Sequence, residues 1–233
     1  MLRLFIRLLS RALMLLLVLP LTNSARGLVA KWMGDDTADR EGRITLNPLA
    51  HLDPLGSLAI MLCGFGWSKP MPISPTRMKN YKLGVIMISL TGPVTHFISA
   101  IICYAICYSM ICADNIANAW NEFSYYGIVS PVACLILLIQ LLANINVCLG
   151  VINILPLPPM DGFNILHQFA GSKFNRWYYT NYRMINQVSL FILLGLFIIG
   201  DVTDGLIDPL GWLIGIVDSL LRLTVSWIPH VFG

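Results

Sequence analysis

Charged side chains are scarce in this chain. Asp, Glu, Lys and Arg make up 12% of its 233 residues, about half of the roughly 25% that soluble domains carry. Hydrophobic residues make up 57%, and the mean hydropathy is +0.73. This composition excludes an ordinary soluble domain. It indicates an integral multi-pass membrane protein whose first partner is the lipid bilayer.

Several other signals are missing. The net charge of +3 is small and the Lys and Arg residues are scattered among loops, so no nucleic-acid partner is expected. Six cysteines lie in or beside apolar runs without CxxC spacing, which indicates buried free thiols rather than a redox or zinc site. No internal repeat or low-complexity linker interrupts the chain. We therefore expect one membrane-embedded domain over residues 1–233.

Long apolar runs dominate what is present. A run of about 20 apolar residues crosses a bilayer as a helix. An apolar stretch at 210–228 fits either a further span or an amphipathic helix on the membrane surface. The sequence predicts an all-α polytopic fold with four to five transmembrane helices, at 12–33, 83–113, 128–154 and within the C-terminal helices 188–229.

The N-terminal segment has two interpretations. Its charged start and small-residue stretch near Ser24 fit a signal peptide, but the apolar character resumes at 27–33, which favours a retained helix. Lys and Arg occur in loops 67–82 and 171–187 and not in 114–126, so the first two loops are predicted to be cytoplasmic and the N-terminus external. The three arginines within residues 1–11 argue the other way. We expect them to lie flat at the opposite interface.

A polar insertion separates the first two spans. Residues 34–56 have mixed charge and frequent Gly and Pro, and we expect loop and short strand there. Residues 57–66 are apolar but too short to span, which predicts a re-entrant or interfacial segment.

One proline-rich turn follows the third span. Pro156, Pro158 and Pro159 lack a backbone N–H and disfavour helix in their predecessors, so the helix should end at Ile154. This places irregular backbone and Asp161 at or just inside the membrane boundary, where an ionisable side chain indicates a functional site. The alternative is that Asp161 only caps a helix at 162–169.

Three stretches resemble the site-2 protease family of intramembrane zinc metalloproteases. The family's N-x-x-P-x-x-P-x-DG signature is matched by NILPLPPMDG. Its loop and the extended segment after it are matched by GDDTADREGRITLNPLAHLDPLG and FGWSKPMPISP. Its G-P-x-x-N stretch is matched by LTGPVTH, with His96 in place of Asn. The resemblance implies a family core over about residues 12–170, with Asp161 at the third zinc-ligand position.

The family's HExxH is missing. Its register falls on Thr22-Asn23-Ser24-Ala25-Arg26, so Thr22 and Arg26 replace the two His ligands and Asn23 replaces the general base. Threonine is a poor zinc ligand, arginine repels a divalent ion, and asparagine cannot take a proton from water. We therefore expect an inactive pseudoprotease without a cofactor, which binds transmembrane helices of client proteins in a bacterial plasma membrane.

Two alternatives remain open. One is an active zinc endopeptidase with a rebuilt metal site of His96 and Asp161, joined by His51 or His167. The other is a small transporter or channel that binds its cargo at the broken helix.

The remaining candidates concern the interior of the protein. Asn146 and Asn153 lie two turns apart on one helix face, and we expect them, with His96, to line a substrate groove, although helix-to-helix hydrogen bonding is an alternative. Arg26 should pair with Asp161 at the former zinc position, with Thr22 and Asn23 hydrogen-bonding nearby. The competing expectation is that Arg26 extends to the headgroups.

Overall fold

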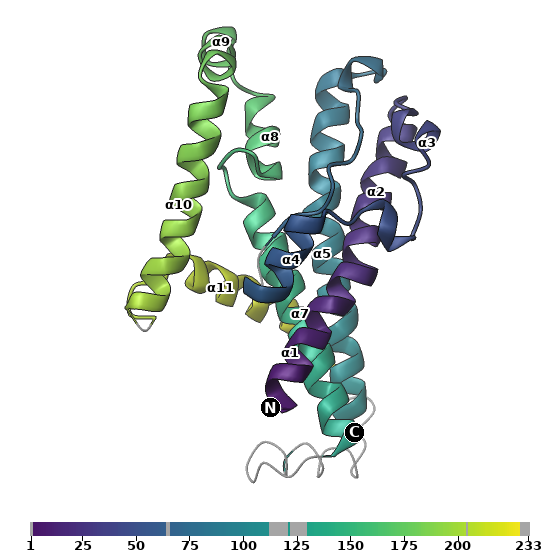
Figure 1. The fold of residues 1–233 in the computed structure, drawn as a ribbon, viewed down its shortest axis with the longest axis vertical. Coiled ribbons are helices and arrows are strands. Elements are labelled where there is room, and N and C mark those ends of the chain that lie inside the picture. The colour runs from purple at the N-terminus through teal and green to yellow at the C-terminus, as the bar shows by residue number, and fades with distance from the viewer. Residues whose placement is uncertain (1, 64–65, 112–120, 122–129, 204, 229–233) are drawn as a thin grey trace.

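The fold is a bundle of helices, seen here in a computed structural model (Figure 1). The structure describes all residues except 1, 64–65, 112–120, 122–129, 204 and 229–233. Among these described residues, four helices are long and apolar enough to cross a membrane, at Leu4–Trp32, Tyr81–Ile111, Pro131–Ile154 and Tyr182–Gly200. The prediction of an all-α membrane fold is confirmed. The predicted loop 114–126 lies outside the described residues.

The first span is one continuous helix in three parts, α1 (Leu2–Leu13), a π-helical turn η1 (Met14–Val18) and α2 (Leu19–Trp32). It begins earlier than predicted and includes the arginines expected to lie flat. The reason is visible at Arg11, whose Nη1 donates to the carbonyls of Met61 and Leu62 at 2.8 and 3.0 Å. These carbonyls end helix α4 (Pro54–Cys63), so Arg11 stabilises the negative end of a helix dipole.

The predicted insertion follows the first span. It contains short helices and extended backbone, namely α3 (Thr37–Arg40), η2 (Pro48–Ala50), α4 and η3 (Pro75–Arg77). The short strand expected within residues 34–56 is not found among the described residues, because α3, turns, η2 and the start of α4 occupy that segment. Helix α4 covers most of the segment predicted to be re-entrant, and it lies against α1 in the middle of the molecule (Figure 1).

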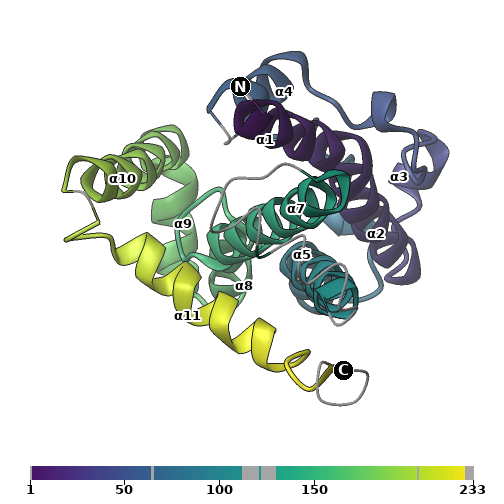
Figure 2. The ribbon, with the colours of Figure 1, turned by 90° about the horizontal axis from the view of Figure 1, so that it is seen from below.

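The centre of the bundle is the pair of helices α5 (Tyr81–Ile111) and α7 (Pro131–Ile154), which α2 joins along one side (Figure 2). Small buried residues such as Ala100, Ala143 and Val147 let the α5 and α7 backbones approach closely. Close packing of this kind holds membrane helices together because lipid supplies no hydrophobic driving force between them.

After the proline-rich turn, α8 (Asp161–His167) and α9 (Ser172–Thr180) lead into α10 (Tyr182–Val202), which stands apart from α5 and descends to α11 (Pro209–Leu223). With 15 residues, α11 is too short to span a bilayer, so of the two interpretations of residues 210–228 the further span is excluded and four spans remain among the described residues. It lies across α5 and α7 (Figure 2). The segment just before α5 and helix α9 both lie at the end of the molecule opposite to the N-terminus (Figure 1). The cytoplasmic side of these loops stays a prediction.

Candidate functional site

The turn after α7 fixes the position of Asp161. Helix α7 ends at Ile154 as the prolines predict, and the chain folds back so closely that a Cβ on Gly162 would lie 1.9 Å from the Ile154 carbonyl oxygen. Only glycine fits there. Met160 is the N-cap residue of α8, and no side chain caps the first turn of that helix. The carboxylate of Asp161 is therefore used elsewhere, contrary to the simple capping alternative.

Asp161 forms an ion pair with Arg26 of α2. Arg26 Nη2 donates to Asp161 Oδ2, and the two side chains are 22% and 13% exposed. The predicted pair is confirmed, and Arg26 does not extend to the headgroups. Gly92 of α5 makes room for it, since a Cβ there would lie 2.0 Å from Arg26 Nη2 and 2.7 Å from Asp161 Oδ2. Helices α2, α5 and α8 thus meet at two opposite charges that neutralise each other.

Thr22 and Asn23 do not complete this pair, and that part of the prediction is wrong. The Thr22 hydroxyl is buried without a hydrogen-bond partner. Asn23 instead donates from Nδ2 to Ser68 Oγ at 3.0 Å, because the extended segment after α4 passes within reach of α2. On α2, the Asn23 side chain is therefore hydrogen-bonded, whereas the Thr22 hydroxyl has no partner.

His96 stands on α5, and its Nδ1 lies 3.1 Å from Asn146 Oδ1. Asn146 Nδ2 in turn donates to the Leu142 carbonyl at 2.9 Å. Both side chains are buried, with Asn146 fully so. This contact joins α5 to α7, as the alternative of helix-to-helix hydrogen bonding foresees.

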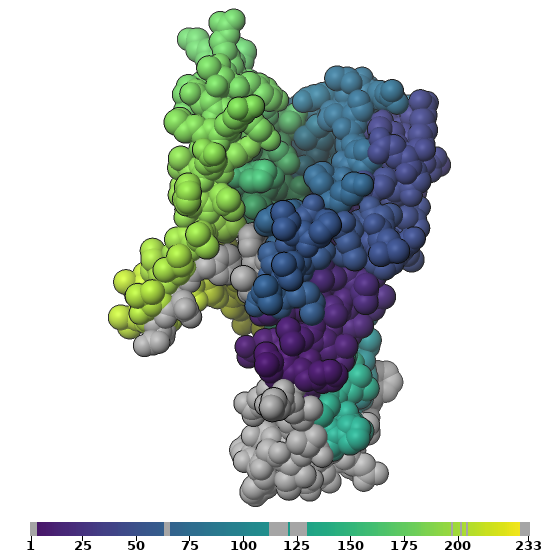
Figure 3. Space-filling model, viewed as in Figure 1, coloured from purple at the N-terminus to yellow at the C-terminus, as the bar shows by residue number. Residues whose placement is uncertain are grey.

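Two cavities meet at the ion pair. The first has a volume of about 390 Å³ and is lined by Thr22, Asn23, Arg26, His96 and Asn153 together with the extended segment and Leu190 of α10. The second, of about 470 Å³, is lined by Arg26, Asp161 and an aromatic group near α9. The space-filling surface is hollowed between α10 and the insertion (Figure 3). Asn153 and His96 therefore line the first cavity, whereas Asn146 lies behind His96 and does not.

The other histidines are not gathered at this site. His51 is buried in the insertion with Nε2 2.7 Å from the Thr45 carbonyl oxygen, and burial lowers its pKa despite that contact. His167 lines the second cavity among Phe163, Tyr178 and Tyr179, and burial lowers its pKa as well.

The residues of the site do not fit a zinc ion. Arg26 and Thr22 offer a cation and a neutral hydroxyl, and Asp161 is already paired. Within the described ranges, no three His, Cys, Asp or Glu side chains lie close enough together to hold a metal.

Sequence reasoning missed three features. Gly92 makes room for the ion pair, and its place beside Pro93 in an apolar helix was the available signal. Ser68 is the partner of Asn23, and nothing in its surroundings marked it. A further polar cluster on α11 was marked only by Asp218 and Arg222, four residues apart in an apolar helix.

A profile of Peptidase family M50 matches residues 27–196, which is most of the chain. This chain belongs to peptidase family M50. The match to this family of site-2 proteases confirms the resemblance seen in the sequence and begins directly after Arg26.

One relative is the “Putative zinc metalloprotease YwhC” of Bacillus subtilis (strain 168), with 33% identity over 151 residues. The aligned region covers 63% of this chain and 62% of the relative, so the chain spans less than two thirds of that protein. No solved structure matches the chain.

Proposed function

We propose that this M50 protein is a catalytically inactive pseudoprotease that binds transmembrane segments of other membrane proteins. The observation that carries the proposal is the ion pair between Arg26 and Asp161. In the register implied by the family motif, Arg26 takes the place of a histidine ligand, and it occupies the carboxylate that would be another ligand. The chain has four histidines, at 51, 96, 167 and 230, and no HExxH.

The general base is also missing in this register. Asn23 replaces the glutamate, and an amide cannot accept a proton from water at neutral pH. The substitutions thus remove both the metal and the base, and either loss alone is enough to stop metal-assisted hydrolysis.

The cavities support a binding role. The first lies between α2, α7 and α10, is mostly apolar and has Asn153, Asn23 and His96 in its wall. Helix α10 packs loosely, with only 18% of its span buried. This arrangement suits an apolar segment that enters sideways from the bilayer, and the expected clients are transmembrane helices in a bacterial plasma membrane.

An active enzyme with a rebuilt zinc site is the second candidate, favoured only by the presence of His96 in the cavity wall. Its expected co-ligand Asp161 lines the other cavity and is paired with Arg26. A cation at His96 would lie near the Arg26 guanidinium, which repels it. Membership of the M50 family leaves the transporter alternative without support of its own.

The experiment is photocrosslinking in membranes. A photoreactive amino acid replaces Asn153 in the cavity wall, or Phe191 on α10 as a control, because that side chain is 70% exposed. Single-span proteins with a tag are co-expressed. We expect crosslinks to intact spans from position 153 and few from 191. Shortened products that depend on this protein, or equal crosslinking at both positions, would contradict the proposal.

A further inference from the structure

Two hydrogen-bonding groups beside the ion pair have no partner in the protein. Thr22 Oγ1 and Arg26 Nε are both buried and unsatisfied, and Thr22 is only 3% exposed. Both residues line the cavity of about 390 Å³. Buried polar groups nearly always have a hydrogen-bond partner, so two unpaired groups in one cavity wall require an explanation. A ligand that accepts hydrogen bonds from them would supply it.

His96 adds an acceptor to the same wall. Asn146 uses its Nδ2 to donate to the Leu142 carbonyl, and its Oδ1 therefore faces His96 Nδ1. A neutral imidazole that donates from Nδ1 has a free lone pair on Nε2. The wall thus combines two donors with one acceptor.

The charge of the site restricts the ligand. Arg26 is neutralised by Asp161, so the pair has no net charge to attract an anion, and an anion would have to compete with the carboxylate already bound. A metal ion would find a guanidinium and a hydroxyl in place of anionic ligands. A neutral group with one acceptor and one donor fits best, and the peptide group has one C=O and one N–H.

Building on the proposed function, we propose that Thr22, Arg26 and His96 form a binding site for one peptide group of a client transmembrane segment. The client carbonyl accepts from Thr22 Oγ1 and Arg26 Nε, and the client N–H donates to His96 Nε2. Peptide groups within a continuous helix are already bonded to their own helix. The client is therefore a segment locally unwound, as at a proline. With neither base nor metal beside it, the peptide bond is held and not hydrolysed.

The first test replaces Thr22 by Val, which keeps the shape and removes the hydroxyl. The probe is a synthetic transmembrane peptide of about 20 residues with a central Gly-Pro, and its affinity for the full-length protein is measured by fluorescence transfer in phosphatidylcholine vesicles. We expect Thr22→Val to bind the peptide about five- to tenfold more weakly, as loss of one hydrogen bond implies. The same variant should unfold at a higher temperature, because an unsatisfied buried hydroxyl has been removed.

Thr95→Val is the matched control. The Thr95 hydroxyl donates to the Thr91 carbonyl of its own helix at 2.7 Å, and Thr95 is not among the residues that line the cavity. This change should leave peptide affinity unaltered. Equal affinity of the Thr22→Val and wild-type proteins would overturn the peptide-group site.

A second test changes the peptide. The Gly-Pro amide itself has no N–H, so an ester replaces the amide on the N-terminal side of the glycine. This change removes the N–H that would donate to His96 Nε2, and we expect about fivefold weaker binding to the wild-type protein. Undiminished binding of the ester peptide would overturn the role of His96. Failure of the wild-type protein to bind any peptide would overturn the proposed function itself, so the two failures are distinguishable.

Discussion

Two Arg–Asp pairs lie among the apolar helices that the structure describes, and they differ in how completely their polar atoms are hydrogen-bonded. Arg26 and Asp161 are 135 residues apart in sequence and join α2 to the turn after α7. Arg222 and Asp218 lie one turn apart on α11, with Arg222 Nε 2.7 Å from Asp218 Oδ2.

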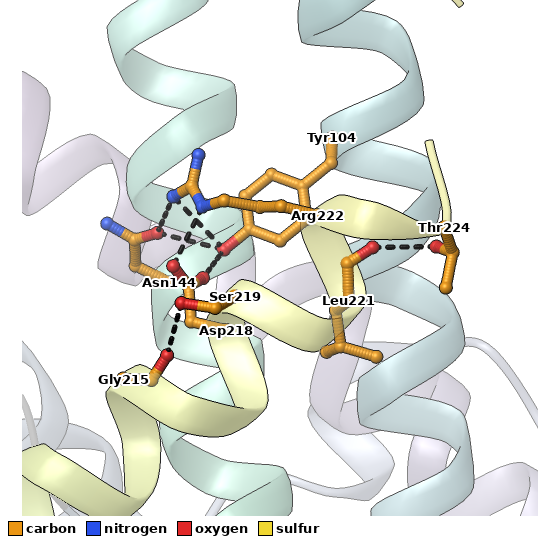
Figure 4. A network of polar contacts seen from close by, with 8 residues as sticks. All are labelled: Tyr104, Asn144, Gly215, Asp218, Ser219, Leu221, Arg222 and Thr224. Atoms are coloured by element: carbon orange, nitrogen blue, oxygen red, sulfur yellow. Dashed lines mark hydrogen bonds and ion pairs between the residues drawn. The ribbon is translucent and has the colours of Figure 1, made fainter. Parts of the chain in front are cut away.

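The pair on α11 belongs to a closed network (Figure 4). The Tyr104 hydroxyl of α5 donates to Asp218, and Arg222 Nη2 lies 3.3 Å from Asn144 Oδ1 of α7. The Arg222 guanidinium also lies 4.3 Å from the centre of the Tyr104 ring. None of these four side chains has a buried atom without a partner.

The difference indicates two different roles. A fully satisfied polar network in a membrane fastens helices together, and here it holds α11 across α5 and α7. The pair at Arg26 leaves Arg26 Nε and the neighbouring Thr22 hydroxyl unsatisfied beside a cavity. That incompleteness is what a binding site would leave in the absence of its ligand.

The largest effect is expected from breaking the closed network. Arg222→Leu leaves Asp218 without its cation and removes the contact with Tyr104, and it should lower the free energy of unfolding by about 3 to 5 kcal/mol. Thermal unfolding in detergent micelles measures it. Arg183→Leu, at an exposed position of α10, is the control and should change stability by no more than about 0.5 kcal/mol. Equal stability of the two variants would show that α11 is not held by this network.

The pair of Arg26 and Asp161 should give a slightly smaller effect. Arg26→Leu and Asp161→Leu each leave one charge unpaired and should each cost about 3 kcal/mol, and the double variant should regain much of the loss. The same unfolding assay gives the coupling energy. Additive losses in the two single variants would mean that the pair contributes nothing as a pair.

A methyl group added next to the Arg26–Asp161 pair tests how tightly the pair packs against α5, with both charges kept. Gly92→Ala places a Cβ against Arg26 Nη2 and Asp161 Oδ2, and it should cost about 1 to 3 kcal/mol. The control is Gly195→Ala, where a Cβ meets no atom within 4 Å, and higher helix propensity should make that variant no less stable. A Gly92→Ala protein as stable as its control would contradict the packing of the pair against α5.

Asp35 is a buried carboxylate that lies outside the spans, and its substitution should give the smallest effect. Burial raises its pKa, but hydrogen bonds from Thr37 and Ser74 and the charge of Arg77 outweigh this and hold the pKa below its usual value. The stabilisation is therefore present above the unfolded pKa of about 3.9 and is lost as pH falls through the lower, folded value. Asp35→Asn should unfold at a temperature that depends less on pH in this acidic range than the wild type does. An unchanged pH dependence would contradict this role.

Local chemistry made much of the fold predictable. Prolines that lack an N–H ended α7 at Ile154, and long apolar runs located the four spans. The pair of Arg26 with Asp161 was predictable because, in the register that the resemblance implies, both positions would hold one metal.

The rest of the fold and of the site depends on long-range contacts that no local sequence pattern indicates. Tyr104 and Asp218 are 114 residues apart, and nothing near either residue indicates the other. The position of Arg11 could not be predicted because its partners are backbone carbonyls, and carbonyls carry no sequence signal. The unsatisfied hydroxyl of Thr22 depends on the detailed packing of its neighbours.

The most direct test of the pseudoprotease account is the zinc content of the wild-type protein, purified without chelators and measured by elemental analysis. The account predicts far less than one zinc per chain, because the Asp161 carboxylate is already in an ion pair with Arg26. A triple variant with Thr22→His, Asn23→Glu and Arg26→His, prepared in parallel, should recover zinc, since Asp161 and its turn remain in place. About one tightly held zinc per wild-type chain would contradict the account and favour a metal site rebuilt around His96.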